Sequence, residues 1–201
     1  MNHSTAPMTS PAPQLAHSPA ATQTSLRIAG VLGFAALTAL CAQITFPIPG
    51  TPVPVTLQTL PVTLAACALG ARLGAVSMAL YLLVGLLGLP VFADASGGVT
   101  TILGKTGGYL FAFMLVPPLT AFALRSRNNT STGWRGVIGQ VVLANLVIFT
   151  LGVAWLRLFV PTWDAALVQG LYPFLPGTII KSAMAVLLGA AIAPWAMRRV
   201  W

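Results

Sequence analysis

Long apolar runs fill this sequence from Leu26 onward, and turns that contain glycine, proline or arginine separate them. Only 6% of the 201 residues are charged, whereas a soluble domain carries about 25%. The runs are continuous, whereas the strands of a transmembrane β-barrel alternate apolar and polar residues. We therefore predict an all-α integral membrane protein that folds as a bundle of six transmembrane helices.

The limits of the six helices follow from the places where the apolar runs break. The first two predicted helices cover about residues 26–45 and 55–69. A tight turn at 71–74 leads into the third helix, which ends near residue 89. The last three helices cover about residues 106–124, 136–159 and 178–196. Residues 1–25 are rich in Ser, Thr, Ala and Pro and cannot bury enough apolar area to fold alone. We expect a disordered cytoplasmic tail at 1–25 and one transmembrane substrate-binding domain at 26–201.

The basic residues are divided unevenly between the two ends of this predicted bundle. One end collects seven of the ten, namely Arg27, Arg72, Arg125, Arg127, Arg135, Arg198 and Arg199. Because cytoplasmic loops carry an excess of Lys and Arg, both termini are predicted to be cytoplasmic, in a multi-pass protein of the cytoplasmic (inner) membrane. The arginines are scattered at helix ends rather than gathered with aromatic residues, which argues against nucleic-acid binding.

This topology brings three unusual segments to the outer face of the membrane. The first is a proline-rich segment, in which Pro47, Pro49, Pro52 and Pro54 forbid a helix and favour a stiff loop that can act as a lid or a plug. The second contains Thr106, Gly107, Gly108 and Tyr109. Its glycines form either a simple interhelical turn or a place where the backbone approaches a ligand closely. The third is Pro-Phe-Leu-Pro-Gly at residues 173–177.

Polar side chains near this outer face are candidates for ligand binding. Lys181 lies inside an apolar helix, where a charge costs a few kcal/mol, so it either binds a substrate carboxylate or carbonyl or extends toward the headgroups. Asp94 is either a ligand acceptor or a solvated loop acid. Asn145 lies in mid-helix and either bonds to another helix or contacts the ligand. The other candidates are Gln58, Thr106, Tyr109, Phe174 and Thr178.

Several kinds of functional group are missing from the sequence. It has no Glu, no paired carboxylates and no His within the apolar runs, so we expect no enzymatic activity, no metal site and no cofactor. It has no Walker motif, so an energy source for transport would lie in another protein. The pattern favours a binder of a small, mostly neutral solute. A structural membrane subunit and a membrane enzyme are the alternatives from other functional classes.

Four motifs in this order and spacing resemble the BioY family. They are Thr-Pro-Val-Pro-Val-Thr-Leu-Gln-Thr-Leu at 51–60, Leu-Gly-Leu-Pro-Val-Phe at 87–92, Thr-Gly-Gly-Tyr-Leu at 106–110, and Pro-Phe-Leu-Pro-Gly at 173–177 followed by Lys181. The members of that family are the biotin-specific substrate-binding (S) components of energy-coupling-factor (ECF) vitamin transporters. The resemblance extends from about Leu26 to the C-terminus.

The resemblance implies a six-helix bundle that binds biotin near the outer surface. It also implies partners, namely one transmembrane coupling protein and two ATP-binding-cassette ATPases. On the family pattern, Ala35 and Ala39 would dock on the coupling protein and the proline-rich loop would close over the vitamin. From the residues alone, this small-residue helix either packs within the chain or docks on a partner.

Two positions depart from the family pattern. Lys105 stands where the family usually has proline, and Thr178 stands where it often has an aspartate, while Lys181 matches. An S component or solitary facilitator for another small vitamin-like carboxylate is therefore the alternative function.

Overall fold

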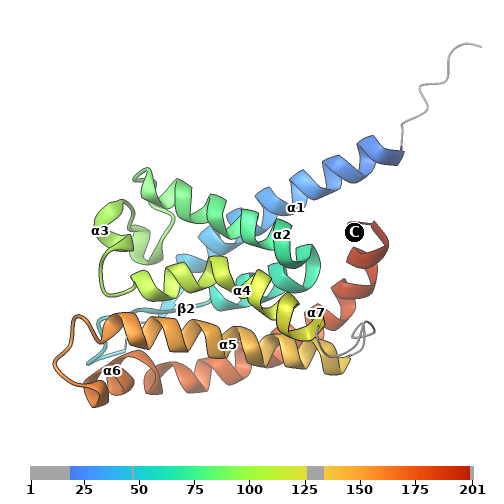
Figure 1. Cartoon of the computed structure of the whole chain (residues 1–201). Coiled ribbons are helices and arrows are strands. Elements are labelled where there is room, and N and C mark those ends of the chain that lie inside the picture. Colours follow the sequence, from blue (N-terminus) through green and yellow to red (C-terminus); the bar gives the residue numbers. More distant parts are fainter. Residues whose placement is uncertain (1–18, 47, 126–133, 200–201) are drawn as a thin grey trace, which may run out of the picture.

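The computed structural model describes residues 19–46, 48–125 and 134–199 (Figure 1). Its long helices are α1 (Pro19–Ala42), α2 (Thr59–Leu86), α4 (Gly107–Arg125), α5 (Trp134–Leu156) and α7 (Leu175–Arg199). Between them lie short elements, namely β1 (Thr45–Phe46), β2 (Val55–Thr56), η1 (Ala93–Ala95), α3 (Val99–Ile102), α6 (Trp163–Gly170) and η2 (Tyr172–Phe174). The predicted all-α class is confirmed.

Helix α2 consists of two arms that meet at Gly70. This residue has φ 69° and ψ −164°, a backbone conformation that glycine adopts readily and other residues avoid. Figure 1 shows α2 turning back on itself, and the non-helical backbone places this turn at Gly70. The two arms are the second and third predicted helices, so the described part of the chain forms the predicted six-helix bundle. The turn itself lies at Gly70 and not at residues 71–74, where Gly74 packs closely against Pro117 of α4 instead.

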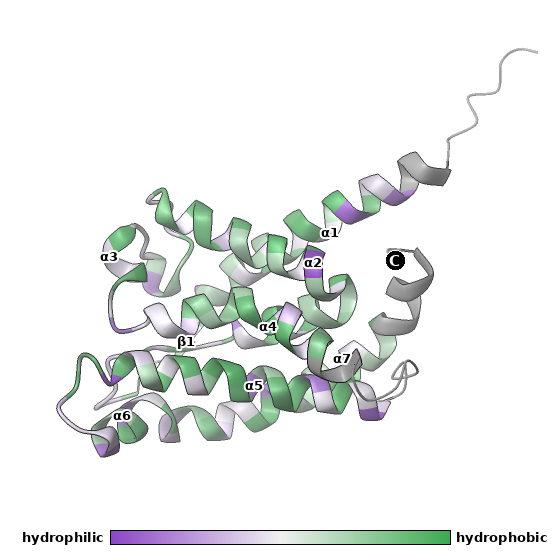
Figure 2. Ribbon diagram, viewed as in Figure 1, coloured by the Kyte–Doolittle hydropathy of each residue, from purple (hydrophilic) through white to green (hydrophobic). Residues whose placement is uncertain are grey.

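The two ends of the bundle differ in character. The start of α1, the Gly70 turn and the end of α7 lie at one end, and the β1–β2 hairpin, α3 and α6 lie at the other (Figure 1). Figure 2 shows hydrophilic positions of α1, α2 and α5 near the first end, and these helices contain Arg27, Arg72 and Arg135. This arrangement agrees with a cytoplasmic location for both termini.

The outer surface of the bundle suits lipid. Four helical stretches are long and apolar enough to cross a membrane in the described residues, and Gly107–Phe122 is a shorter apolar helix. Large apolar side chains point outward, among them Phe122 (77% exposed) and Leu187 (73%). In water such side chains would be costly, whereas in a bilayer they meet hydrocarbon.

Several helix boundaries differ from the prediction. Helix α1 begins at Pro19 instead of Leu26, because proline is well suited to the first helical position and alanines follow it. The predicted tail is therefore helical over 19–25, and residues 1–18 lie outside the described residues. Helix α5 ends at Leu156, and the predicted loop after it contains α6, whose first turn is capped by the Thr162 hydroxyl accepting from the Ala165 amide.

The inner face of α1 is the face that carries Ala35 and Ala39. Ala35 is 7% exposed and belongs to the main core, and Ala39 packs against that core. Burial in the core therefore argues against docking through Ala35, whereas Ala39 is half-buried and its docking on a partner stays a prediction. The small residues on the exposed face of α1 are Ala29, Gly33 and Ala36.

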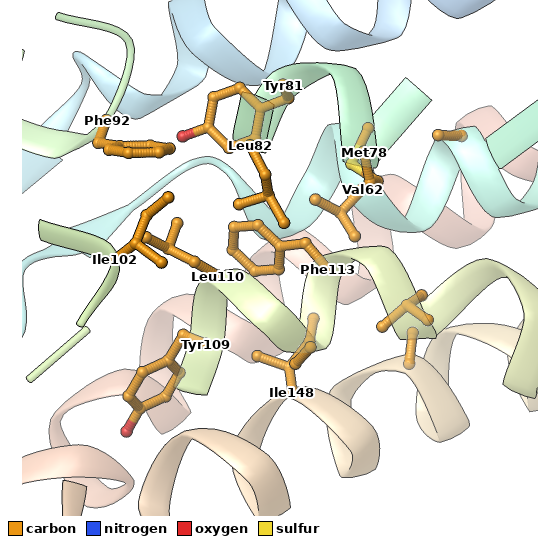
Figure 3. Close-up of a cluster of buried hydrophobic side chains, with 14 of the residues drawn as sticks. Val62, Met78, Tyr81, Leu82, Phe92, Ile102, Tyr109, Leu110, Phe113 and Ile148 are labelled. Carbon is orange, nitrogen blue, oxygen red and sulfur yellow. The ribbon is translucent and has the colours of Figure 1, made fainter. Parts of the chain in front are cut away.

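The main core lies between α2, α4 and α5, directly next to the cavity described below. Figure 3 shows Tyr81, Phe92, Leu110 and Phe113 pointing toward one another. The Tyr81 and Phe92 rings meet edge to face with centroids 5.4 Å apart. Close packing here gives the cavity rigid walls.

Candidate functional site

A cavity of about 220 Å³ opens at the end of the bundle that carries the hairpin, α3 and α6. It gathers residues from β2, α2, the loop before α3, α4, α5 and α7. Eight of the predicted residues line it, namely Pro54, Gln58, Asp94, Thr106, Tyr109, Phe174, Thr178 and Lys181. The segments that the sequence predicted to meet on the outer face therefore do surround one site.

Lys181 points inward from the second turn of α7. Its side chain is 6% exposed, and its ammonium Nζ donates a hydrogen bond of 2.8 Å to the backbone carbonyl of Thr56. This geometry decides against the alternative in which Lys181 extends toward the headgroups. This carbonyl uses one of the three N–H donors of the ammonium, so the other donors can serve a ligand oxygen.

A chain of hydrogen bonds runs along one wall from Thr56 through Gln58 to Tyr81. The Thr56 hydroxyl donates to Gln58 Oε1 at 2.8 Å, and Gln58 Nε2 donates to the Tyr81 hydroxyl at 2.5 Å. The Tyr81 hydroxyl then donates to the carbonyl of Val91 at 3.2 Å. Gln58 is only 5% exposed, and buried polar groups need such partners. This network fixes the polar wall before any ligand arrives.

Aromatic rings form another part of the wall. Tyr109 of α4 and Phe174 of η2 stack with centroids 6.0 Å apart, and Phe149 of α5 meets Phe174 at 6.1 Å. The Tyr109 hydroxyl donates to the carbonyl of Gly170 at 2.7 Å, which holds α4 to the end of α6. Because the hydroxyl is engaged there, the ring of Tyr109 contributes an apolar surface to the cavity.

The two glycines at the start of α4 pack against neighbouring backbone and Trp155 and do not line the cavity. A Cβ on Gly107 would lie 3.0 Å from Trp155 Nε1, and one on Gly108 would lie 2.6 Å from the Leu151 carbonyl oxygen. The Trp155 indole donates to the Gly104 carbonyl at 2.9 Å and fills the adjoining space. The ligand contact predicted for these glycines finds no support, because α5 and, at Gly107, the Ile102 carbonyl lie against them.

Asn145 connects two helices outside the cavity lining. Its Nδ2 donates to the Val141 carbonyl at 2.8 Å and to the Ser182 hydroxyl at 3.0 Å. Of the two alternatives for this residue, the structure supports the bond between helices α5 and α7.

The proline-rich segment is the loop of a short antiparallel hairpin in which Thr45 pairs with Thr56. Pro54 lines the main cavity, and Pro52 and Pro54 line a neighbouring cavity of about 180 Å³ that also touches Asp94. Pro49 is exposed and lines neither, and Pro47 lies outside the described residues. The Thr51 hydroxyl donates to the Gln169 carbonyl at 2.5 Å and so ties the loop to α6. These placements fit a lid.

Sequence reasoning missed several lining or supporting residues. Among the polar ones are Thr56, Tyr81 and Thr101, and among the apolar ones are Val53, Phe92, Phe113, Ile148 and Phe149. The apolar residues carry no distinguishing signal, because a cavity wall and a packed core use the same side chains. Thr56 gave a weak signal, since it follows the last proline of the loop and precedes a buried helix.

Comparison with known proteins links this arrangement to one family. The BioY family model matches residues 13–198. A probable biotin transporter BioY of Pyrococcus horikoshii is 40% identical over 155 residues, which cover 77% of this chain and 88% of the relative. The biotin transporter BioY of Thermotoga maritima is 37% identical over 155 residues, with the same shares covered.

One solved structure has the same fold. It is the crystal structure of the S-component for biotin from an ECF-type ABC transporter, with a TM-score of 0.77 and 27% sequence identity. The match covers 85% of this chain and 92% of that chain.

Proposed function

This chain belongs to the BioY family, and from that premise we propose that it binds biotin at the outer face of the cytoplasmic membrane as the S component of an ECF-type transporter. The observation that carries the proposal is Lys181, a buried cation in a cavity whose other walls are mainly aromatic and aliphatic. Biotin has matching chemistry, since it combines a compact neutral ring system with oxygens of a ureido group and a carboxylate.

Different walls of the cavity bind different parts of the ligand. The stacked rings of Tyr109 and Phe174 offer apolar area for the ligand rings. The ammonium of Lys181 donates to a ligand oxygen, and a charge-assisted bond of this kind is stronger than a neutral one. Thr178 lines the cavity near Lys181 as an uncharged group that donates or accepts a hydrogen bond. Asp94 at the exposed rim accepts a hydrogen bond from the ligand's polar end.

The partners follow from the same family membership. We propose that the chain assembles with one transmembrane coupling protein and two ATP-binding-cassette ATPases, since its sequence carries no Walker motif of its own. The candidate docking face consists of the exposed small residues Ala29, Gly33 and Ala36 of α1 together with the half-buried Ala39, and it leaves out the buried Ala35. Small residues let another membrane helix approach closely.

Uptake of labelled biotin in cells tests this function. Biotin-auxotrophic cells that express the chain together with a coupling protein and its ATPases should accumulate biotin, and the Lys181→Met variant should reduce uptake strongly. A matched control is Lys105→Ala, because Lys105 is exposed and does not line the cavity. Failure of the wild-type chain to support uptake above empty cells would reject the proposal. Uptake without the partners would instead identify a solitary facilitator.

A further inference from the structure

The rim of the main cavity is formed in part by a tight turn over residues 92–96. Its two central residues, Asp94 and Ala95, both have positive φ angles, 56° and 52°. The Ser96 amide donates to the Ala93 carbonyl at 3.2 Å and closes the turn. Turns with two left-handed residues in succession normally use Asn, Asp or Gly, and alanine is disfavoured there. The Asp-Ala pair therefore needs support from outside the turn.

Gln43, just past the end of α1, supplies this support with both ends of its side-chain amide. Its Nε2 donates to the Phe92 carbonyl at 3.1 Å, and its Oε1 accepts from the Ala95 amide at 3.1 Å. The same Nε2 also donates to the Ala39 carbonyl one turn back in α1, at 3.1 Å. One side chain thus bridges the turn and fixes it to the helix.

The turn determines where several cavity residues lie. Phe92, Asp94 and Ser96 belong to it, and all three line the cavity. The Phe92 ring is buried against Tyr81, and Gly85 leaves the space for it. The Asp94 side chain is exposed instead. The position of its carboxylate depends on the left-handed backbone that Gln43 holds.

We propose that Gln43 is a positioning residue for ligand binding, which acts by holding the Phe92–Ser96 turn, and with it Asp94, in the shape that completes the cavity. The identity of the ligand rests on the proposed function, whereas the support of the turn does not. The length and chemistry of the side chain both matter. Asparagine is one methylene shorter than glutamine, and alanine offers neither donor nor acceptor.

Hydrogen exchange on the full chain in detergent, without ligand, tests the support of the turn directly. The Gln43→Ala variant should exchange the amides of residues 92–96 faster than the wild type, because the Ala95 amide loses its acceptor. The matched control is Gln140→Ala in α5, which lines no cavity described above and should leave this segment unchanged. Equal exchange in Gln43→Ala and wild type would overturn the proposal, whatever the ligand is.

Calorimetric titration with biotin tests the consequence for binding. Gln43→Ala and Gln43→Asn should each bind roughly 5- to 30-fold more weakly than the wild type, the loss expected when one or two hydrogen bonds no longer preorganise the site. Adding Ala95→Gly to Gln43→Ala should restore most of the affinity, because glycine adopts the left-handed conformation without support. A double variant no better than Gln43→Ala, or a Gln43→Ala variant with wild-type affinity, would refute the positioning role. Absence of binding by the wild type would refute the biotin assignment alone and leave the exchange result to decide on Gln43.

Discussion

The ammonium of Lys181 in α7 donates to the backbone carbonyl of Thr56 in β2 at 2.8 Å, across 125 positions of sequence. This bond links the last helix to the strand that ends the proline-rich loop. It places a cation at the polar wall of the cavity, beside the chain of hydrogen bonds from Thr56 to Tyr81. The loop and the last helix therefore meet at this side chain, where we propose that the ligand also binds.

Replacing Lys181 with methionine should weaken biotin binding more than tenfold, since a hydrogen bond to a charged group contributes about 1.5–3 kcal/mol. Methionine keeps much of the volume and removes the charge, so the protein should still fold and insert. Equilibrium binding to the purified variant measures the loss, and its elution as a single detergent-solubilised species checks the fold. An affinity within twofold of the wild type would contradict a ligand role for Lys181.

Replacing Gly108 with alanine should destabilise the bundle by about 1–3 kcal/mol, because the new methyl group has no room beside Trp155 and the Leu151 carbonyl. Thermal unfolding in detergent measures the effect. The control is Gly33→Ala on α1, where a Cβ would meet nothing within 4 Å. That control should be neutral or stabilising by up to about 1 kcal/mol. Equal effects of the two changes would show that Gly108 is not tightly packed.

Replacing Ala35 with leucine should lower the unfolding temperature, whereas Ala36→Leu should not, because adjacent positions face the core and the outside respectively. The expected cost at Ala35 is about 1–3 kcal/mol for overpacking. Ala36→Leu should instead reduce the amount of coupling protein that co-purifies with the chain. If Ala35→Leu were the variant that lost the partner at unchanged stability, the orientation of α1 described above would be wrong.

Replacing Thr51 with valine should speed the release of bound biotin several-fold, because the loop loses its bond to the Gln169 carbonyl. Valine has nearly the shape of threonine, so the change removes the hydroxyl and little else. Release of labelled biotin into excess unlabelled biotin measures the rate. Thr100→Val, at an exposed position that lines neither cavity, is the control. Identical release rates for all three proteins would argue against the loop as a lid.

The bundle could be predicted from the sequence because membrane helices are long, apolar and bounded by charges and prolines. The inward position of Lys181 could be anticipated for a related reason, since a lone cation in an apolar helix needs a partner. Both predictions are reliable because the alternatives, apolar helices in water and an unpaired charge in hydrocarbon, cost much free energy. The exact position of the turn between the two arms of α2 depends on the backbone conformation of one residue, Gly70. In the sequence, Gly74 is an equally plausible position for that turn.

The faces of the helices could not be predicted, because lipid and protein core are equally apolar. For that reason Ala35 and Ala36 were indistinguishable in the sequence, and the inward one was assigned to docking. Gly107 and Gly108 present the same difficulty. Because glycine has no side chain, it leaves room equally well for a neighbouring helix or for a ligand. Only the position of Trp155 shows which of the two lies against these glycines.

The support of the rim turn by Gln43 also lies beyond sequence reasoning. Gln43 and Ala95 are far apart in the chain, and a glutamine at the end of a helix is ordinarily a solvated residue. Only the structure shows that its amide matches the two backbone groups of the left-handed turn.

Calorimetric titration of the full chain, purified alone in detergent, with biotin tests the central claim most directly. The account predicts saturable one-to-one binding without any partner, because the cavity is already formed in the single chain. An absence of binding to biotin, from protein that elutes as a folded species, would contradict the assignment of this cavity as a biotin site.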